Sequence, residues 1–121
     1  MKVSIVIPVY NEEKIIENTL EQVYGFVHSR YKDFEIIIAN DGSSDNTLKN
    51  VEKESKKYSK MIIINQTKNQ GRGSVLSLAF SQIKGEIGIY LDADLAININ
   101  LLPSLIHEIE QGYDIAIGSK H

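Results

Sequence analysis

The 121-residue sequence contains no cysteine, only two prolines and no long hydrophobic run. The absence of cysteine excludes disulfide bonds and cysteine-ligated zinc, and it is typical of a cytoplasmic protein. No apolar stretch approaches the roughly 20 residues that span a membrane, and the N-terminus lacks the pattern of a cleavable signal peptide. The chain has no excess of positive charge either. Its formal net charge of −3 argues against broad nucleic-acid binding.

The residues that are present predict a single α/β domain. With 42% hydrophobic and 24% charged residues, the composition is that of an ordinary globular protein, and we find no internal repeat or linker. Five apolar segments rich in β-branched residues predict strands, over residues 3–9, 34–39, 61–64, 87–91 and 113–117. Between them, helical patterns begin at residues 11–13, after residues 40–46, after residues 71–73 and at residue 101. Several strands are apolar on both faces, which favours a mainly parallel sheet covered by helices on both sides.

Two aspartates follow the predicted fourth strand directly. Asp92 and Asp94 are separated by one alanine, after an apolar run that would be buried. Carboxylates at such a strand end can reach one point in the crevice outside the sheet, where Mg²⁺ or Mn²⁺ would be a natural partner. The alternative is a solvated turn, since aspartate is common in turns.

Chemically distinctive residues also follow the other predicted strands. Because the carboxyl ends of parallel strands meet at one edge of a sheet, these groups share one rim with Asp92 and Asp94. This combination favours a functional site that holds a pyrophosphate between a metal and basic residues. The groups are Tyr10-Asn11-Glu12, Asp41-Gly42-Ser43, Gly71-Arg72-Gly73 and Ser119-Lys120.

Three rim residues have alternative interpretations on spacing alone. Asp41 could accept a hydrogen bond from the ring N–H of a base, or it could cap the helix that begins near Ser44. Ser43 and Ser44 are alternative caps for the same helix. Tyr10 could stack on a base or cover the end of the sheet. Arg72 could bind an anion or lie at the surface near a helix N-terminus, where the helix dipole disfavours a cation.

These segments together resemble the family 2 glycosyltransferases, the inverting enzymes with a Rossmann-like GT-A fold. Residues 3–13 resemble the opening of that family, residues 40–47 its second motif, and Leu91-Asp92-Ala93-Asp94 its Asp-x-Asp motif. Residues 69–73 are similar to a loop in the branch that loads polyprenyl phosphates such as dolichyl phosphate. Gly118-Ser119-Lys120 also fits that branch, although arginine is more usual at the last position.

The resemblance implies that the chain binds a nucleotide sugar of the UDP-glucose or GDP-mannose type together with Mg²⁺ or Mn²⁺. It assigns metal binding and catalysis to Asp92 and Asp94. Some family members have a glutamine ligand where this chain has Ala96, so water would replace it here. The predicted donor-binding residues are Pro8, Val9, Tyr10, Glu12, Asp41, Gly71, Arg72, Asp92, Ala93 and Lys120.

The domain of this family is roughly twice as long as this chain, and the part expected to be missing here is the half that binds the acceptor. We therefore expect residues 1–121 to form one nucleotide-sugar-binding domain without that half, and to self-associate through the surface left uncovered. No general base for a sugar hydroxyl is evident, because Glu108, Glu110 and Asp114 fall away from the rim. A polyprenyl phosphate acceptor is already anionic and needs none. Such an acceptor would place the protein at the cytoplasmic face of a membrane.

Other functions fit the sequence less well. A phospho-receiver domain would need an acidic pair after the first strand and an aspartate after the third, where this chain has Asn65. An NAD-binding domain would need Gly-x-Gly-x-x-Gly after the first strand, where this chain has Pro8-Val9-Tyr10. The remaining alternative to an enzyme is a nucleotide-binding fragment or subunit that transfers nothing alone.

Overall fold

One parallel sheet forms the centre of the protein. The computed structural model describes residues 2–93, His107 and residues 116–118. All neighbouring strands pair in parallel, in the order β3-β2-β1-β4-β5. This confirms the α/β fold predicted from the apolar segments. The strands are β1 (Val3–Val9), β2 (Phe34–Asp41), β3 (Met61–Gln66), β4 (Ile87–Leu91) and β5 (Ala116–Gly118).

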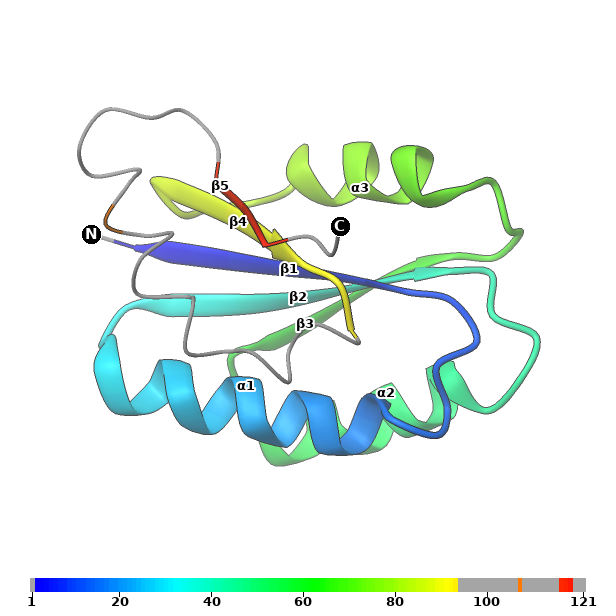
Figure 1. Ribbon diagram of the computed structural model, residues 1–121, viewed down its shortest axis with the longest axis horizontal. Helices are drawn as coiled ribbons and strands as arrows, with labels where there is room; N and C mark the ends of the chain where they lie inside the picture. Colours follow the sequence, from blue (N-terminus) through cyan, green and yellow to red (C-terminus); the bar gives the residue numbers. More distant parts are fainter. Residues whose placement is uncertain (1, 94–106, 108–115, 119–121) are drawn as a thin grey trace.

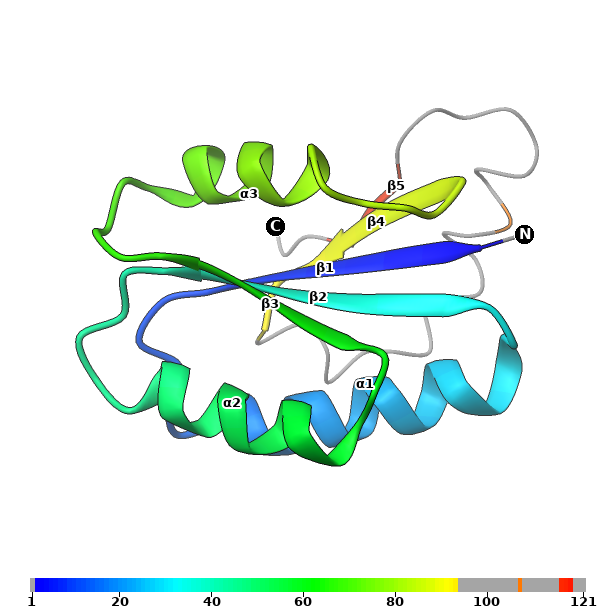
Figure 2. The same cartoon turned by 180° about the vertical axis from the view of Figure 1, so that it is seen from behind.

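Helices cover both faces of the sheet. Helices α1 (Ile16–Arg30) and α2 (Thr47–Lys57) lie side by side on one face, and α3 (Arg72–Phe80) lies on the other (Figures 1 and 2). The helix predicted to begin at residue 101 falls outside the described residues. Within the described part of the chain, no helix has the length and apolar character needed to cross a membrane.

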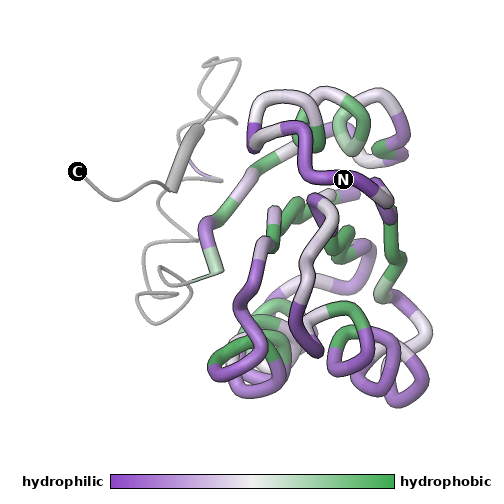
Figure 3. The backbone as a smooth tube through the Cα atoms, turned by 90° about the vertical axis from the view of Figure 1, so that its right-hand side faces the viewer, coloured by the Kyte–Doolittle hydropathy of each residue, from purple (hydrophilic) through white to green (hydrophobic). Residues whose placement is uncertain are grey.

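The alternation of residues along the strands divides the core into two clusters. In β1, Val3, Ile5, Ile7 and Val9 pack with residues of α1, whereas Val6 packs with residues of α3. Both sides of the central strands are therefore buried, which explains their unbroken apolar sequences. In Figure 3 the strands are mostly green and the helices alternate between green and purple, as amphipathic helices do.

Two helices begin later than the sequence predicted. The first was expected from residues 11–13 but starts at Ile16, and Asn11 has a left-handed backbone conformation (φ 52°) that excludes it from a helix. The second was expected near Ser44 but starts at Thr47. Neither serine caps it. Instead, the carboxylate of Asp45 accepts the Thr47 N–H at 2.9 Å.

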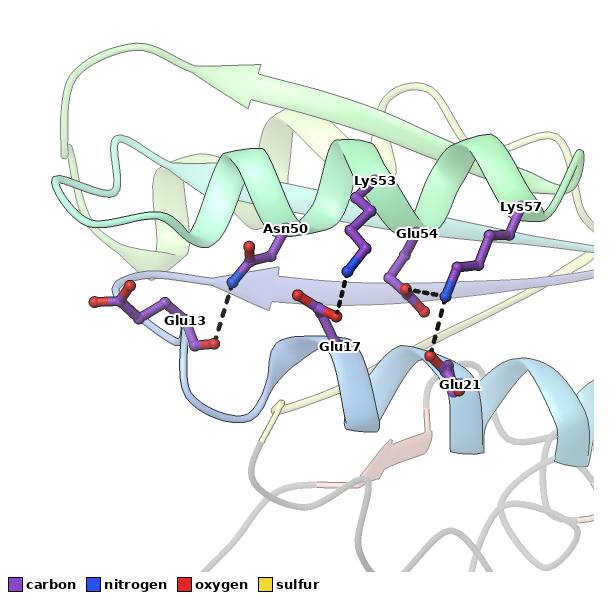
Figure 4. A network of polar contacts seen from close by, with 7 residues as sticks. All are labelled: Glu13, Glu17, Glu21, Asn50, Lys53, Glu54 and Lys57. Carbon is purple, nitrogen blue, oxygen red and sulfur yellow. Dashed lines mark hydrogen bonds and ion pairs between the residues drawn. The ribbon is translucent and has the colours of Figure 1, made fainter.

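Polar side chains join α1 to α2 (Figure 4). Lys53 Nζ lies 3.3 Å from Glu17 Oε2, and Lys57 Nζ lies 3.3 Å from Glu21 Oε2. Lys57 Nζ also lies 2.9 Å from the fully buried carboxylate of Glu54. Hydrogen bonds to Glu54 and Glu21 raise the pKa of Lys57. The two helices therefore form one layer, and the loops that precede them are held together at the same edge of the sheet.

Candidate functional site

The carboxyl ends of β1, β2 and β4 lie side by side because β1 pairs with both other strands. This rim brings together Tyr10 after β1, Asp41 at the end of β2 and Asp92 after β4. The connection from β3 to α3 adds Arg72, the first residue of α3. The rim predicted from the sequence is therefore present among the described residues.

A cavity of about 220 Å³ opens at this rim. Its walls come from the end of β1 and the segment after it, the end of β2, and the β3–α3 connection with the first turns of α3. Seven predicted donor-binding residues line it, and two lining residues, Asn69 and Val75, were absent from the prediction. The full lining is Pro8, Val9, Tyr10, Glu12, Asp41, Asn69, Gly71, Arg72 and Val75.

The segment after β1 is tied to the segment after β2. Asn11 Oδ1 accepts the N–H of Ser44 at 2.8 Å and that of Asp45 at 3.3 Å. The Glu12 N–H donates to Thr47 Oγ1 at 2.7 Å. These bonds hold the side of the cavity formed by residues 8–12 in place. The left-handed conformation of Asn11 is what turns its side chain toward residues 44–45.

Asp45 stabilises this junction as an ionised carboxylate. Partial burial raises the pKa of the Asp45 carboxyl, but hydrogen bonds from the hydroxyl and N–H of Thr47 and from the Glu13 N–H outweigh burial. The pKa is therefore held below its usual value. The aspartate that secures the start of α2 is thus Asp45, and Asp41 has a different role.

Asp41 organises the β3–α3 connection. Its Oδ1 accepts hydrogen bonds from Gln66 Nε2 at 2.7 Å and the Gln70 N–H at 2.9 Å. Its Oδ2 accepts from Asn69 Nδ2 at 3.0 Å and the Gly71 N–H at 2.9 Å. The helix-capping alternative for Asp41 was therefore wrong, because its carboxylate turns toward residues 66–71 and away from α2.

Asp92 is buried in a different environment. Its side chain is 9% exposed, and its Oδ1 accepts no hydrogen bond among the described residues. Among the described residues Asp92 pairs with Arg72, whose side chain is 59% exposed. Arg72 Nη2 lies 3.1 Å from Asp92 Oδ1, and Nη1 lies 3.4 Å from Oδ2. The guanidinium therefore offsets the charge of Asp92 from the edge of the cavity.

The chemistry of Asp92 fits a hard divalent cation. A buried carboxylate oxygen without a hydrogen bond is costly, and oxygen ligands are those that Mg²⁺ prefers. Asp94, the second predicted ligand, lies outside the described residues, as do Ala96 and Lys120. Within the described part, no three acidic, histidine or cysteine side chains gather as a complete metal site. The neighbouring Ala93 is buried, and its carbonyl accepts the Thr19 hydroxyl at 3.2 Å.

Comparison with known proteins identifies the family. The profile described as "Glycosyl transferase family 2" matches residues 4–121. The chain belongs to this family. The match covers nearly the whole chain and confirms the resemblance seen in residues 3–13, 40–47 and 91–94.

Curated relatives in this family include two sugar transferases named for polyprenyl phosphates. The undecaprenyl-phosphate 4-deoxy-4-formamido-L-arabinose transferase of Proteus mirabilis is 37% identical over 115 residues, covering 94% of this chain and 35% of the relative. The dolichol-phosphate mannosyltransferase of Pyrococcus furiosus is 34% identical over 121 residues, covering 100% of this chain and 34% of the relative. The chain therefore spans about a third of the length of these relatives.

A solved structure of similar fold carries a donor and a metal. The mannosyltransferase PcManGT from Pyrobaculum calidifontis, in complex with GDP-Man and Mn²⁺, matches with a TM-score of 0.69 and 26% identity. The match covers 76% of this chain and 27% of that one. It supports the GT-A-like fold, and it shows that a protein of this fold binds a nucleotide sugar together with a divalent metal.

Proposed function

We propose that this chain binds a nucleoside-diphosphate sugar in the rim cavity, with Mg²⁺ or Mn²⁺ at Asp92 and Asp94. The observation that carries the proposal is the buried Oδ1 of Asp92, which accepts no hydrogen bond from the described residues and lies 3.1 Å from Arg72 at the cavity wall. A carboxylate in this state is balanced by a cation, and Arg72 is too exposed to be a strong permanent partner.

The walls of the cavity suit the two ends of such a donor. The half-exposed Tyr10 offers apolar surface to a base or ribose, and the buried Pro8, Val9 and Val75 support that side of the cavity. Gly71 and Arg72 also line the cavity, and they suit the diphosphate because Arg72 is cationic and contacts Asp92. Glu12, Ala93 and Lys120 complete the proposed donor-binding set. The backbone of Gly71 has a positive φ of 101°, which favours a residue without a side chain beside the diphosphate.

We propose further that the donor serves inverting sugar transfer to a polyprenyl phosphate. In such a reaction the acceptor oxygen attacks the anomeric carbon opposite the leaving nucleoside diphosphate, and the bond from that carbon to the diphosphate breaks. The metal would neutralise charge that develops on the leaving diphosphate. Arg72 would add positive charge on the same side. A phosphate acceptor is already ionised, so no general base is required.

The two polyprenyl-phosphate relatives support this choice of acceptor. The finding that the chain spans about a third of their length supports a second candidate, a nucleotide-binding module that transfers nothing by itself. A transfer assay with polyprenyl phosphate separates the two candidates. Sugar transfer by the chain supports the enzyme, and donor binding without transfer supports the module.

Calorimetric titration tests the binding proposal directly. GDP-mannose and UDP-glucose would be titrated with and without Mn²⁺. We expect one of them to bind, with higher affinity when Mn²⁺ is present. Equal affinity with and without Mn²⁺ would contradict the metal site, and the absence of binding by both would contradict the donor site.

A further inference from the structure

We propose that a pocket at the amino ends of β2 and β3 is a second binding site, which takes the phosphate group of a small soluble molecule. The pocket lies at the edge of the sheet opposite to the rim (Figure 1). The eight residues of β2 separate the two edges by about 20–25 Å. The site itself does not rest on the proposed function, because it shares no lining residue with the rim cavity.

Two segments that are distant in the sequence form this pocket. The end of α1 and the turn after it supply residues 28–32, and the turn before β3 supplies Lys60. The pairing of β2 with β3 brings the two segments together. The pocket has a volume of about 460 Å³. This volume lies within the range of sites for small molecules, which is about 300–1,000 Å³.

The lining of the pocket is basic, although the net charge of the protein is −3. Arg30, Lys32 and Lys60 are permanently charged, and His28 lies beside them. Asp33, the one acidic residue in the segment 28–34, does not line the pocket. The lysines that join α1 to α2 pair with glutamates, whereas the three cations of the pocket form no ion pair within the described part of the chain. Their positive charge is therefore available to attract an anion.

Lys60 is held in place by uncharged groups. Its Nζ donates to the backbone oxygen of Lys32 at 2.8 Å and lies 4.5 Å from the centroid of the buried Phe34 ring. Neither contact neutralises the charge. An ammonium group has three donors, so Lys60 keeps donors for a ligand. The side chain is partly buried, and its position is therefore set before an anion arrives.

Stacked aromatic rings support the pocket from below. Tyr24 of α1 stacks on Tyr58, with ring centroids 4.1 Å apart, and on His28 at 5.5 Å. The Phe34 ring meets Tyr24 edge-on at 5.6 Å. These rings join α1, the turn before β3 and the start of β2. The pocket is therefore part of the folded core of this edge, and its walls keep a fixed distance from one another.

The dipole of α1 explains only part of the basic cluster. The carboxyl end of a helix is partially negative, which accounts for His28 and Arg30 in the last turn of α1. It does not account for Lys60, which comes from another segment and lines the same pocket. The guanidinium of Arg30 lies over the Phe26 ring at 4.1 Å. An arginine fork together with a fixed lysine is a combination that suits the oxygens of a phosphate group.

Phosphate groups occur both in soluble molecules and in lipid head groups. The position of the pocket favours the soluble source. A membrane in contact with this edge would lie on the far side of the sheet from the rim, where we propose that a polyprenyl phosphate reacts. Only this choice of source, and not the phosphate site itself, uses the proposed function.

A titration with sodium phosphate at constant ionic strength, followed by NMR of the backbone amides, tests the site. We expect saturable shifts, largest at residues 28–34 and at Lys60. Lys60→Met removes the charge and keeps the aliphatic stem, so the affinity for phosphate should fall about tenfold. Lys49→Met is the matched control, because Lys49 is an exposed lysine near the other end of α2. Equal losses in the two variants, or the same shifts with sodium chloride, would overturn the site.

Arg30→Gln provides a second variant, and this exposed position leaves the fold intact if Lys60→Met does not. We expect it to weaken phosphate binding about tenfold as well, and unchanged binding would contradict the arginine–lysine pair. Cosedimentation with phosphatidylcholine vesicles, with and without phosphatidylglycerol, distinguishes the source. Binding to the anionic vesicles that depends on Lys60, without binding of free phosphate, would overturn the soluble source.

A third measurement separates this site from the rim. UDP-glucose and GDP-mannose, titrated with Mn²⁺, should bind Lys60→Met as they bind the wild type, because Lys60 lies at the opposite edge of the sheet. A changed affinity would contradict the separation of the two sites. If neither nucleotide sugar binds the wild type, the proposed function fails, and the phosphate titration still decides the second site.

Discussion

Two buried aspartates at the ends of β2 and β4, the strands on either side of β1, have opposite surroundings. Asp41, at the end of β2, accepts four hydrogen bonds from one segment of the chain. Asp92, after β4, keeps one buried oxygen that accepts no hydrogen bond from the part of the chain that the structure describes, and it pairs there with a mostly exposed arginine. The acceptor positions of the Asp41 carboxylate are all occupied by hydrogen bonds within the fold, whereas the Asp92 carboxylate retains capacity for a ligand. The hydrogen-bond partners of a rim carboxylate, and not its position alone, therefore decide whether it has a structural role or can bind a ligand.

Replacing Gly42 should produce the largest change in stability, because it breaks the packing around Asp41. Gly42→Ala forces a Cβ into backbone atoms of residues 68–69 and strains a left-handed conformation. We expect the free energy of unfolding to fall by about 2–4 kcal/mol, measured by urea denaturation. Gly25→Ala is the matched control. Gly25 lies within α1 with open space around it, so this change should stabilise by about 0.5–1 kcal/mol. Similar effects of both changes would contradict the close approach.

Asp92→Asn tests the other side of the comparison. We expect this change to reduce Mn²⁺-dependent affinity for the nucleotide sugar by about 100-fold, because a charged ligand to the metal is lost. Its stability without metal should change by no more than about 0.5 kcal/mol, since the ion pair that is removed has a mostly exposed arginine. Calorimetry and urea denaturation measure the two quantities. A stability loss of several kcal/mol would show that Asp92 is structural after all.

Asp41→Asn, unlike Asp92→Asn, should clearly lower the stability of the protein. We expect the free energy of unfolding to fall by about 1–3 kcal/mol, because four part-buried hydrogen bonds lose their charged acceptor. Compared in the same denaturant series, this variant should be less stable than Asp92→Asn. Equal stability of the two variants would contradict the structural role of Asp41 relative to Asp92.

The smallest effect concerns the junction between the segments after β1 and β2. The pKa of Asp45 is lowered in the folded state, so its contribution to stability is complete above the unfolded pKa. That contribution is lost as the pH falls through the lower, folded value. Asp45→Asn should therefore cost up to about 1 kcal/mol at pH 7 and less in strong acid. Urea denaturation at the two pH values measures this change. A cost that stays constant in acid would contradict the ionised form.

Periodicity and turn residues were sufficient to predict the parallel sheet and its rim. The apolar runs over residues 3–9 and 87–91 coincide with β1 and β4, because strands buried on both faces leave an unambiguous pattern. The order of motifs along the chain placed Tyr10, Asp41 and Asp92 at one edge. Helix starts were less accurate, since Asn11 and Asp45 act through contacts between segments about 34 residues apart.

The roles of individual side chains were decided only by the tertiary structure. Nothing near Asp41 in the sequence shows that residues 66–71 supply its partners, because the pairing of β2 with β3 brings them together. Asn69 stands two residues before Gly71 in a recognisable loop motif, yet only its contact with Asp41 orients the amide. Local sequence therefore determined the strands and the edge of the sheet at which the candidate site lies. Hydrogen bonds between distant segments determined which rim carboxylate keeps an oxygen free for the proposed metal.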